Sequence, residues 1–290
     1  MATPANSSAC ASAPATRPPG ELVTRADDTP VPDFPALLRL DGRGFVIIGA
    51  GQGIGRQTAH ALAAAGAQTV CVDVDADLAD GVAAEVGGVP WVGDATNRGD
   101  VARLFVDSGA ALGRIHGVVD IVGMATRYDL LDLDDETWDW QFDIVLRHAM
   151  LAMQYGGRSI AATGGGTIVF VASVSGVTSA PRHAAYGAAK AGLMSLVRTG
   201  AVELGPSGIR VNAVAPGVVW TPRVSAFLGD EGRRRNVENT PLGRVAQPAD
   251  IAAAILFLSC DLSAFVNGQT LVVDGGVGAK FPYPRPPSED

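Results

Sequence analysis

The stretch GFVIIGAGQGIGRQTAHAL, residues 44–62, decides the fold. Its first five residues form an apolar run that predicts a buried strand, and the Ala-rich segment that follows has the spacing of a helix. Between them Gly49, Gly51, Gly53 and Gly55 permit a tight turn and a close approach of the backbone to a ligand. This order predicts a dinucleotide site, where the N–H groups of the helix N-terminus bind the pyrophosphate.

The same alternation continues along the chain. Short Val- and Ile-rich runs, typical of buried parallel strands, occur at 44–48, 69–73, 89–93, 116–123, 166–173, 209–216 and 269–274. Helical patterns lie between them, most clearly at 55–66, 97–112 and 249–259. The chain is therefore predicted to be an α/β protein, with a Rossmann-type doubly wound parallel sheet of about seven strands and helices on both faces in a single domain.

Shifts in composition limit this domain. Residues 1–37 are rich in Ala, Pro and Ser and lack the apolar centre of a secretory signal, so we expect a disordered tail. The same shift in composition places the folded, dinucleotide-binding domain at 38–280, and the Pro-rich segment 281–290 is expected to be a second tail.

Charge and composition narrow the partners. Of the 290 residues 47% are hydrophobic and 18% charged, and the net charge is −8, so nothing favours nucleic acid or an anionic membrane. Three cysteines and four histidines without ligand spacing predict neither a disulfide framework nor a metal site. We expect a cytoplasmic protein with a small-molecule substrate.

Asp73, at the end of the second apolar run, suits the ribose of NAD. A carboxylate there accepts hydrogen bonds from the ribose hydroxyls and repels the 2′-phosphate of NADP. Gln52 and Val74 add no positive charge, whereas Arg56 is close in sequence. The alternative for Asp73 is the N-cap of the next helix.

A Tyr and a Lys four residues apart suggest the chemistry. Tyr186 and Lys190 share one face of a small-residue helix, and a nearby ammonium favours ionisation of a phenol whose ordinary pKa is about 10. Ser173 ends the preceding strand. The alternative is that Tyr186 caps a core and Lys190 is solvated.

With these motifs in this order, residues 40–277 resemble the short-chain dehydrogenase/reductase family in its single-domain, NAD-dependent form. The resemblance implies that Ser173 binds the substrate oxygen, that Tyr186 is the general acid or base, and that Lys190 holds the nicotinamide ribose. It places the cofactor, NAD, at Gly49, Gly51, Gln52, Gly53, Ile54, Gly55, Asp73, Val74, Asp94, Ala95, Val122, Gly123, Tyr186, Lys190, Pro216, Gly217, Val219 and Thr221.

Two departures from the family pattern stand out. The usual Asn-Asn-Ala-Gly after the fourth strand is Asp120–Gly123 here, so local support of the strand must differ. Val145 occupies the position of an Asn that helps hold a water between the lysine and solvent. Our hypothesis is that the proton leaves by another route, through water on backbone carbonyls or a nearby polar side chain.

Six residues are expected on the substrate side: Met124, Val174, Ser175, His183, Trp220 and Phe227. The apolar ones predict a hydrophobic pocket, although ordinary core residues would look the same. His183 could instead cap a helix or lie on the surface.

Residues 221–244 fall where the family carries a mobile lid, with Gly229 and Gly232 as hinge candidates. Arg233, Arg234 and Arg235 could attract an anionic substrate such as a coenzyme A thioester, but a solvated face is the favoured interpretation. Small residues at 187, 188, 191 and 192, with the family resemblance, point to a helix-paired homodimer or homotetramer.

Three functions remain open. The first is an NAD-dependent oxidoreductase for a hydrophobic secondary alcohol or ketone, steroid-like, terpenoid or aryl. The second is a 3-oxoacyl thioester reductase or 3-hydroxyacyl dehydrogenase, and the third is a dinucleotide-sensing binding protein without turnover.

Overall fold

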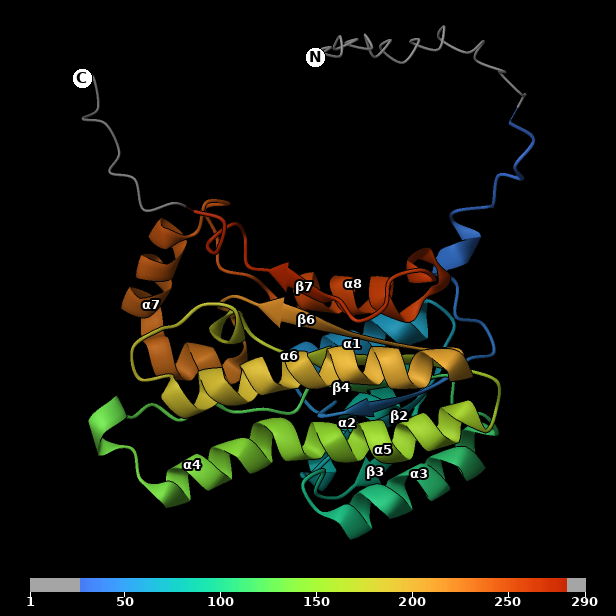
Figure 1. Cartoon of the computed structure of the whole chain (residues 1–290), viewed down its shortest axis with the longest axis horizontal. Coiled ribbons are helices and arrows are strands. Elements are labelled where there is room, and N and C mark those ends of the chain that lie inside the picture. Colours follow the sequence, from blue (N-terminus) through green and yellow to red (C-terminus); the bar gives the residue numbers. More distant parts are fainter. Residues whose placement is uncertain (1–26, 281–290) are drawn as a thin grey trace, which may run out of the picture. The chain divides into compact units, whose positions relative to one another are not determined.

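Seven parallel strands form the centre of the molecule. The computed structural model describes residues 27–280, and from Phe34 onward they form one compact unit. The strands are β1 Gly44–Ile48, β2 Gln68–Asp73, β3 Val89–Val92, β4 Gly117–Asp120, β5 Gly166–Val171, β6 Ile209–Pro216 and β7 Thr270–Val273. Their order, β3-β2-β1-β4-β5-β6-β7, confirms the predicted doubly wound sheet (Figure 1). Of the tail predicted at 1–37, residues 1–26 lie outside the described residues, as does the tail predicted at 281–290. The last residues of the first tail enter a 3-10 turn, Ala36–Leu38.

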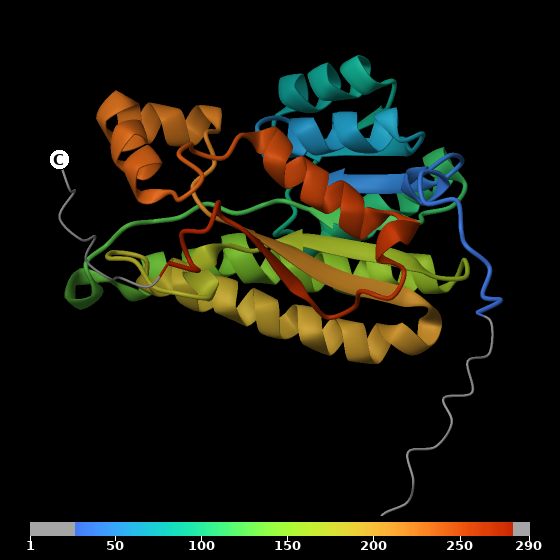
Figure 2. The ribbon, with the colours of Figure 1, turned by 90° about the horizontal axis from the view of Figure 1, so that it is seen from above.

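Helices cover both faces of this sheet. They are α1 Ile54–Ala64, α2 Ala76–Val86, α3 Arg98–Leu112, α4 Asp135–Phe142, α5 His148–Ala161, α6 Ala184–Leu204, α7 Pro222–Asn239 and α8 Pro248–Ser259. Short 3-10 turns include η2 Leu130–Asp132, η4 Val174–Gly176 and η5 Gly205–Ser207, and η3 Asp143–Arg147 is a π-helical turn. Figure 2 shows α1 and α8 on one side of the sheet and α6 on the other.

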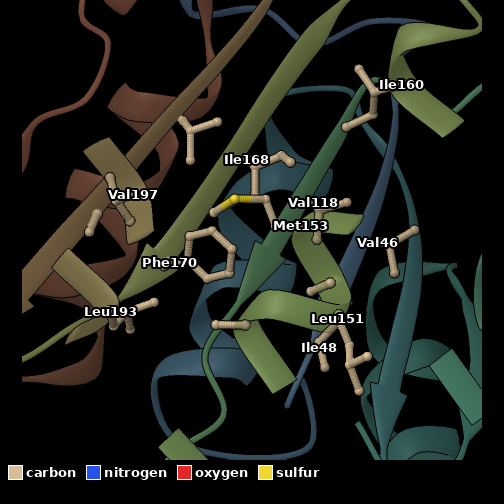
Figure 3. Packing of buried hydrophobic residues seen from close by; sticks show 14 of the residues in the cluster. Val46, Ile48, Val118, Leu151, Met153, Ile160, Ile168, Phe170, Leu193 and Val197 are labelled. Carbon is tan, nitrogen blue, oxygen red and sulfur yellow. The ribbon is translucent and has the colours of Figure 1, made fainter. Parts of the chain in front are cut away.

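Alternating side chains explain the two layers. Val46, Ile48 and Phe170 point to the face packed by α3, α5 and α6, and their cluster is drawn in Figure 3. Their neighbours Ile47 and Val169 pack against α1, α2 and α8. Because both faces of the inner strands are buried, these strands are apolar at almost every position, which is why the runs could be recognised in the sequence.

Replacement of Phe170 tests the larger core. Phe170 is fully buried, whereas Phe265 is fully exposed, with relative exposures of 0% and 104%. We expect Phe170→Ala to lower the free energy of unfolding by about 3–5 kcal/mol through lost burial and a cavity. Phe265→Ala should change it by less than about 0.5 kcal/mol. Urea denaturation of both variants gives the comparison, and equal effects would contradict this account of the core.

Candidate active site

The Gly-rich turn after β1 leaves its backbone open to a ligand. Gly49 and Gly53 adopt φ of 85° and 58°, values that favour glycine. A Cβ on Gly55 would collide with the carbonyl oxygen of Gly49, so only glycine lets α1 start this close to β1. Gln52 is exposed and Ile54 half-buried at the start of α1. The turn therefore has the shape that close approach to a pyrophosphate needs.

Asp73 is oriented by this turn. The Gly51 N–H donates to Asp73 Oδ2 over 2.9 Å, while Val74 beside it is exposed. The N-cap of α2 is Asp75, whose carboxylate accepts from the Leu78 N–H, so the capping alternative for Asp73 is wrong. Asp73 therefore does not cap α2, and its carboxylate lies beside the glycine turn.

Arg56 is neutralised. Its Nε lies 2.7 Å from Glu85 Oε2, and His60 Nε2 contacts the same carboxylate oxygen at 2.8 Å. Both partners lower the pKa of the Glu85 carboxyl, His60 more than Arg56. The positive charge that the sequence put close to Asp73 is therefore held on the surface between α1 and α2.

The remaining predicted cofactor segments lie at the same strand ends. A Cβ on Gly53 would lie 3.1 Å from Thr221 Cγ2, so the first turn touches the segment after β6. Thr221 caps α7, and Val219 pairs with Ala246 in an isolated parallel bridge. Gly217 passes close to Asp274, and Asp94 accepts the Thr96 N–H at 2.8 Å beside the half-buried Ala95.

Lys190 is the most unusual side chain of the site. It is 2% exposed, and its Nζ donates to the Val171 carbonyl oxygen over 2.6 Å. Burial lowers its pKa to about 8, against the opposing charge of Asp120. A Cβ on Gly123 would lie 3.0 Å from Nζ, so the backbone after β4 also borders the ammonium. The alternative of a solvated Lys190 is wrong.

Tyr186 lies one turn before Lys190, whose Nζ is 5.8 Å from the phenol ring centroid. Burial raises the pKa of Tyr186, and a hydrogen bond with Ser173 partly lowers it. Desolvation therefore dominates, and the predicted net lowering of the Tyr186 pKa is wrong for this structure. Ser173 is buried at the end of β5, as predicted, and its Oγ accepts the Ser175 N–H.

The departure at 120–123 contains a pair that sequence reasoning missed. Asp120 Oδ2 lies 2.8 Å from His148 Nδ1, and both residues are buried. Val145, also buried, lies in the π-helical turn just before α5. The signal in the sequence was a carboxylate at the end of a buried strand. The His partner, 28 residues away, had no local signature.

The predicted substrate residues surround the same edge. Met124, Val174, Ser175, His183 and Trp220 are half-buried, and Phe227 is 63% exposed. His183 is the N-cap residue of α6 without a side-chain cap bond, and its Nδ1 lies 3.1 Å from Ser175 Oγ. Its ring meets the Tyr186 ring edge-on at 5.7 Å. His183 therefore contacts the candidate site directly.

The segment 221–244 folds as α7, broken at one predicted hinge. Gly229 has non-helical angles (φ 60°), whereas Gly232 lies within the helix. Arg234 pairs with Glu231 and Glu238, and Arg235 with Glu231. These arginines are exposed and paired, in agreement with a solvated face.

The small residues of α6 divide into two kinds. A Cβ on Gly187 would lie 2.8 Å from the Ser175 carbonyl oxygen, and one on Gly192 would lie 3.1 Å from Leu146. These two glycines pack closely within the chain, and a role of the four small residues in a helix-paired interface stays a prediction. Ala188 and Ala191 are exposed.

Comparison with known proteins decides the family. A family model described as enoyl-(acyl carrier protein) reductase matches residues 49–278. The cis-4-hydroxycyclohexanecarboxylate dehydrogenase of Sinomonas cyclohexanicum is 39% identical, over 81% of this chain and 96% of its own. The 3-oxoacyl-[acyl-carrier-protein] reductase of Thermotoga maritima is 33% identical, over 83% and 99%. A 7α-hydroxysteroid dehydrogenase, solved with NADH and 7-oxoglycochenodeoxycholic acid, gives a TM-score of 0.80 at 31% identity, over 83% and 96%.

This chain belongs to the short-chain dehydrogenase/reductase family. It is an oxidoreductase that acts on the CH–OH group of alcohols or on the corresponding ketones, with a dinucleotide cofactor. Within residues 27–280 there is no helix that could cross a membrane and no cluster of three or more His, Cys, Asp or Glu suited to a metal ion.

A separate hollow lies at the amino ends of the strands of this short-chain dehydrogenase. Its walls include Arg43, His116, Arg210 and Phe265. Ligands of doubly wound sheets bind at the carboxyl ends, and the hollow contains none of the predicted site residues. We therefore assign the active-site candidate to the opposite edge, where the arrowheads of β6 and β7 point toward α7 (Figure 1).

Removal of the buried charge tests the electrostatics of Lys190. Its pKa of about 8 in the folded protein lies below the ordinary 10.5, so below pH 8 both states are protonated and burial of the charge destabilises the fold. Between these values the folded state loses its proton first, and stability rises with pH. The excess, defined as the free energy of unfolding of Lys190→Met minus that of the wild type, should therefore fall as the pH passes from about 8 to 10.5.

Denaturation at several pH values measures this difference. Lys280→Met, at the exposed second lysine, is the matched control for loss of one lysine. An excess that stayed constant or grew with pH would contradict the assigned cost of the buried ammonium.

Proposed function

We propose that this protein is an NAD-dependent dehydrogenase for a hydrophobic secondary alcohol, or a reductase of its ketone. The observation that carries the proposal is the assembly of Ser173, Tyr186 and a fully buried Lys190 at one strand edge. Asp73 lies at the same edge, beside the glycine turn. Each of the four has the chemistry that its role requires.

The residues of this chain have the chemistry that NAD binding requires. The glycine turn offers backbone N–H groups for the pyrophosphate, and Asp73 offers a carboxylate for the ribose. Since Arg56 is engaged with Glu85, no free guanidinium of that residue favours a 2′-phosphate. When bound, the nicotinamide supplies the hydride chemistry. Gly123 borders the Lys190 ammonium, and Thr221 caps α7.

Proton transfer falls to Tyr186. Ser173 donates a hydrogen bond to the substrate oxygen and fixes it, while the Tyr186 hydroxyl gives or takes the proton of that oxygen. Burial keeps Tyr186 protonated in the structure as it stands, which suits donation to a ketone. For alcohol oxidation the phenolate must form, and the Lys190 ammonium favours it electrostatically.

Exposed apolar side chains at the rim of the site, on the loop before α4 and on α7, support a hydrophobic substrate. Leu130, Leu131 and Phe227 are 72%, 96% and 63% exposed. The segments that carry them are joined, since Arg127 lies over the Phe227 ring at 4.2 Å and Arg182 pairs with Asp129. Exposed apolar groups around a site are typical of a ligand-binding surface. Two relatives are named for a hydroxycyclohexanecarboxylate and a hydroxysteroid, whereas others are named for polyols such as D-threitol and galactitol. The preference for a hydrophobic cyclic alcohol therefore rests on the exposed apolar side chains of this chain.

A thioester substrate has weaker support. The reductase of Thermotoga maritima makes it a candidate, but Arg234 and Arg235 are bound by acidic partners of their own helix and Arg233 lies over Trp220. A homodimer or homotetramer is proposed from the exposed Ala188 and Ala191 together with Leu271 and Val272 on the edge strand β7.

The decisive assay follows NADH formation from a panel of cyclic alcohols, steroids and 3-hydroxyacyl thioesters at mildly alkaline pH. We expect turnover with a hydrophobic secondary alcohol and a loss of about a hundredfold or more in Tyr186→Phe, since the proton donor is removed. Tyr155→Phe, on α5 away from this edge, should keep the wild-type rate. NAD binding with no turnover on any compound would favour the non-catalytic alternative.

Cofactor selectivity tests Asp73. Asp73→Ser removes the charge that repels a 2′-phosphate, so the ratio of kcat/KM for NAD to that for NADP should fall about tenfold or more. Asp77→Asn removes an exposed charge in the first turn of α2 and should leave the ratio unchanged. An unchanged ratio in Asp73→Ser would remove Asp73 from the cofactor site.

A further inference from the structure

Two polar side chains are buried behind the candidate active site at the end of β4. Asp120 and His148 are each 1% exposed, and His148 Nδ1 lies 2.8 Å from Asp120 Oδ2. Asp120 Oδ1 accepts the Val122 N–H at 3.2 Å. His148 Nε2 is buried, and no residue among 27–280 gives it a hydrogen-bond partner. A carboxylate only accepts, so Nδ1 carries the proton in this contact.

The sheet brings this pair to Lys190. Asp120 is paired with Phe170 across β4 and β5, and paired residues point to the same face. That face is covered by α5, which begins with His148, and by α6, which carries Lys190. Lys190 Nζ bonds to the carbonyl oxygen of Val171, the residue after Phe170.

Burial of an ammonium requires compensation. Desolvation disfavours the charged form, and a single carbonyl acceptor leaves the charge without a counter-ion. The Asp120 carboxylate opposes desolvation and raises the pKa of Lys190. The elements packed against α6 are β6, η3, η4, η5, α4 and α5. Their titratable residues, with those of α6 itself, are Asp135, Glu136, Asp139, Asp143, Arg147, His148, Tyr155, Arg158, Tyr186, Arg198, Glu203 and Arg210. Asp120, on β4, is the charged group that shifts Lys190.

We propose that Asp120 is the counter-ion of Lys190 and that His148 is the positioning residue that holds this carboxylate through Nδ1. Asp120 stands where the family pattern has an amide, and His148 lies three residues beyond Val145. Its consequence for catalysis rests on the proposed function, because an uncharged Lys190 could neither bind the ribose as a cation nor favour a phenolate. The pair itself is a property of the fold.

The composition of this chain permits a direct test. Lys190 and Lys280 are the two lysines of the sequence. Protein labelled with 13C at lysine Cε therefore gives two lysine signals, and Lys280→Arg identifies the one from Lys190. Titration of the intact wild-type protein should place the midpoint of Lys190 near 8. In Asp120→Asn, which keeps the shape and removes the charge, we expect the midpoint to fall by about one pH unit or more.

Two variants of His148 separate its nitrogens. His148→Asn places an amide N–H where Nδ1 was and deletes Nε2, so the Lys190 midpoint should remain near that of the wild type. His148→Leu removes the N–H that donates to the Asp120 carboxylate. Loss of this hydrogen bond in a buried position favours an uncharged Asp120, so the Lys190 midpoint should fall, as in Asp120→Asn. Should Asp120→Asn not fold, His148→Leu still tests the proposal.

An unchanged Lys190 midpoint in both Asp120→Asn and His148→Leu would overturn the counter-ion. Equal shifts in His148→Asn and His148→Leu would overturn the role of Nδ1. The NMR titration uses no substrate, so it stands even where the alcohol panel gives no turnover. Where turnover is found, the alkaline limb of kcat/KM should move to lower pH in Asp120→Asn, whereas a merely structural role would lower the rate equally at every pH.

Discussion

The buried ammonium of Lys190 constrains the carboxyl edge of the whole sheet. A cation without water must have acceptors and an opposite charge at fixed positions, and here they come from the ends of two strands, β5 and β4. The chain around it is correspondingly tight. A Cβ on Gly123 would lie 3.0 Å from Nζ, and one on Gly176 would lie 2.8 Å from the nitrogen of Ala191, the residue after Lys190. Glycine and alanine in these segments let η4 and α6 close over the charge.

On the cofactor side of the edge, close backbone contacts likewise hold distant segments together. Asp73 is held by a backbone N–H of the turn after β1, and that turn in turn touches Thr221 after β6. Three segments far apart in sequence are thus fixed by one hydrogen bond and one close contact. The second oxygen of Asp73 accepts the Asp75 N–H at 3.2 Å, so backbone groups on both sides orient this carboxylate.

The rim differs in character from this rigid base. It is formed by the loop before α4, the loop before α6 and the broken helix α7, and their links are surface contacts such as Arg127 over Phe227 and Arg182 with Asp129. Exposed ion pairs of this kind contribute little to stability. Relatives with the same fold act on different alcohols, which agrees with a constant base and a variable rim.

The sequence by itself determined the seven strands, the glycine turn and the spacing of Tyr186 and Lys190. These features are local, since apolar runs, glycine spacing and a four-residue interval on a helix depend on neighbours along the chain. It also indicated correctly that the run of arginines is solvated. Residue roles at the site, the cytoplasmic location and the oligomeric state stay predictions.

Only the tertiary structure decided the electrostatics. The partners Asp120 and His148 are 28 residues apart, and Arg56 and Glu85 are 29 apart, so no local pattern relates them. Burial, which depends on how the layers pack, raised the pKa of Tyr186 where the sequence suggested the reverse. The same packing places Gly187 and Gly192 of α6 in close contact with Ser175 and Leu146 of their own chain. Spacing along the chain fixes which groups share a helix face, whereas packing of distant elements fixes their solvation and therefore their charge.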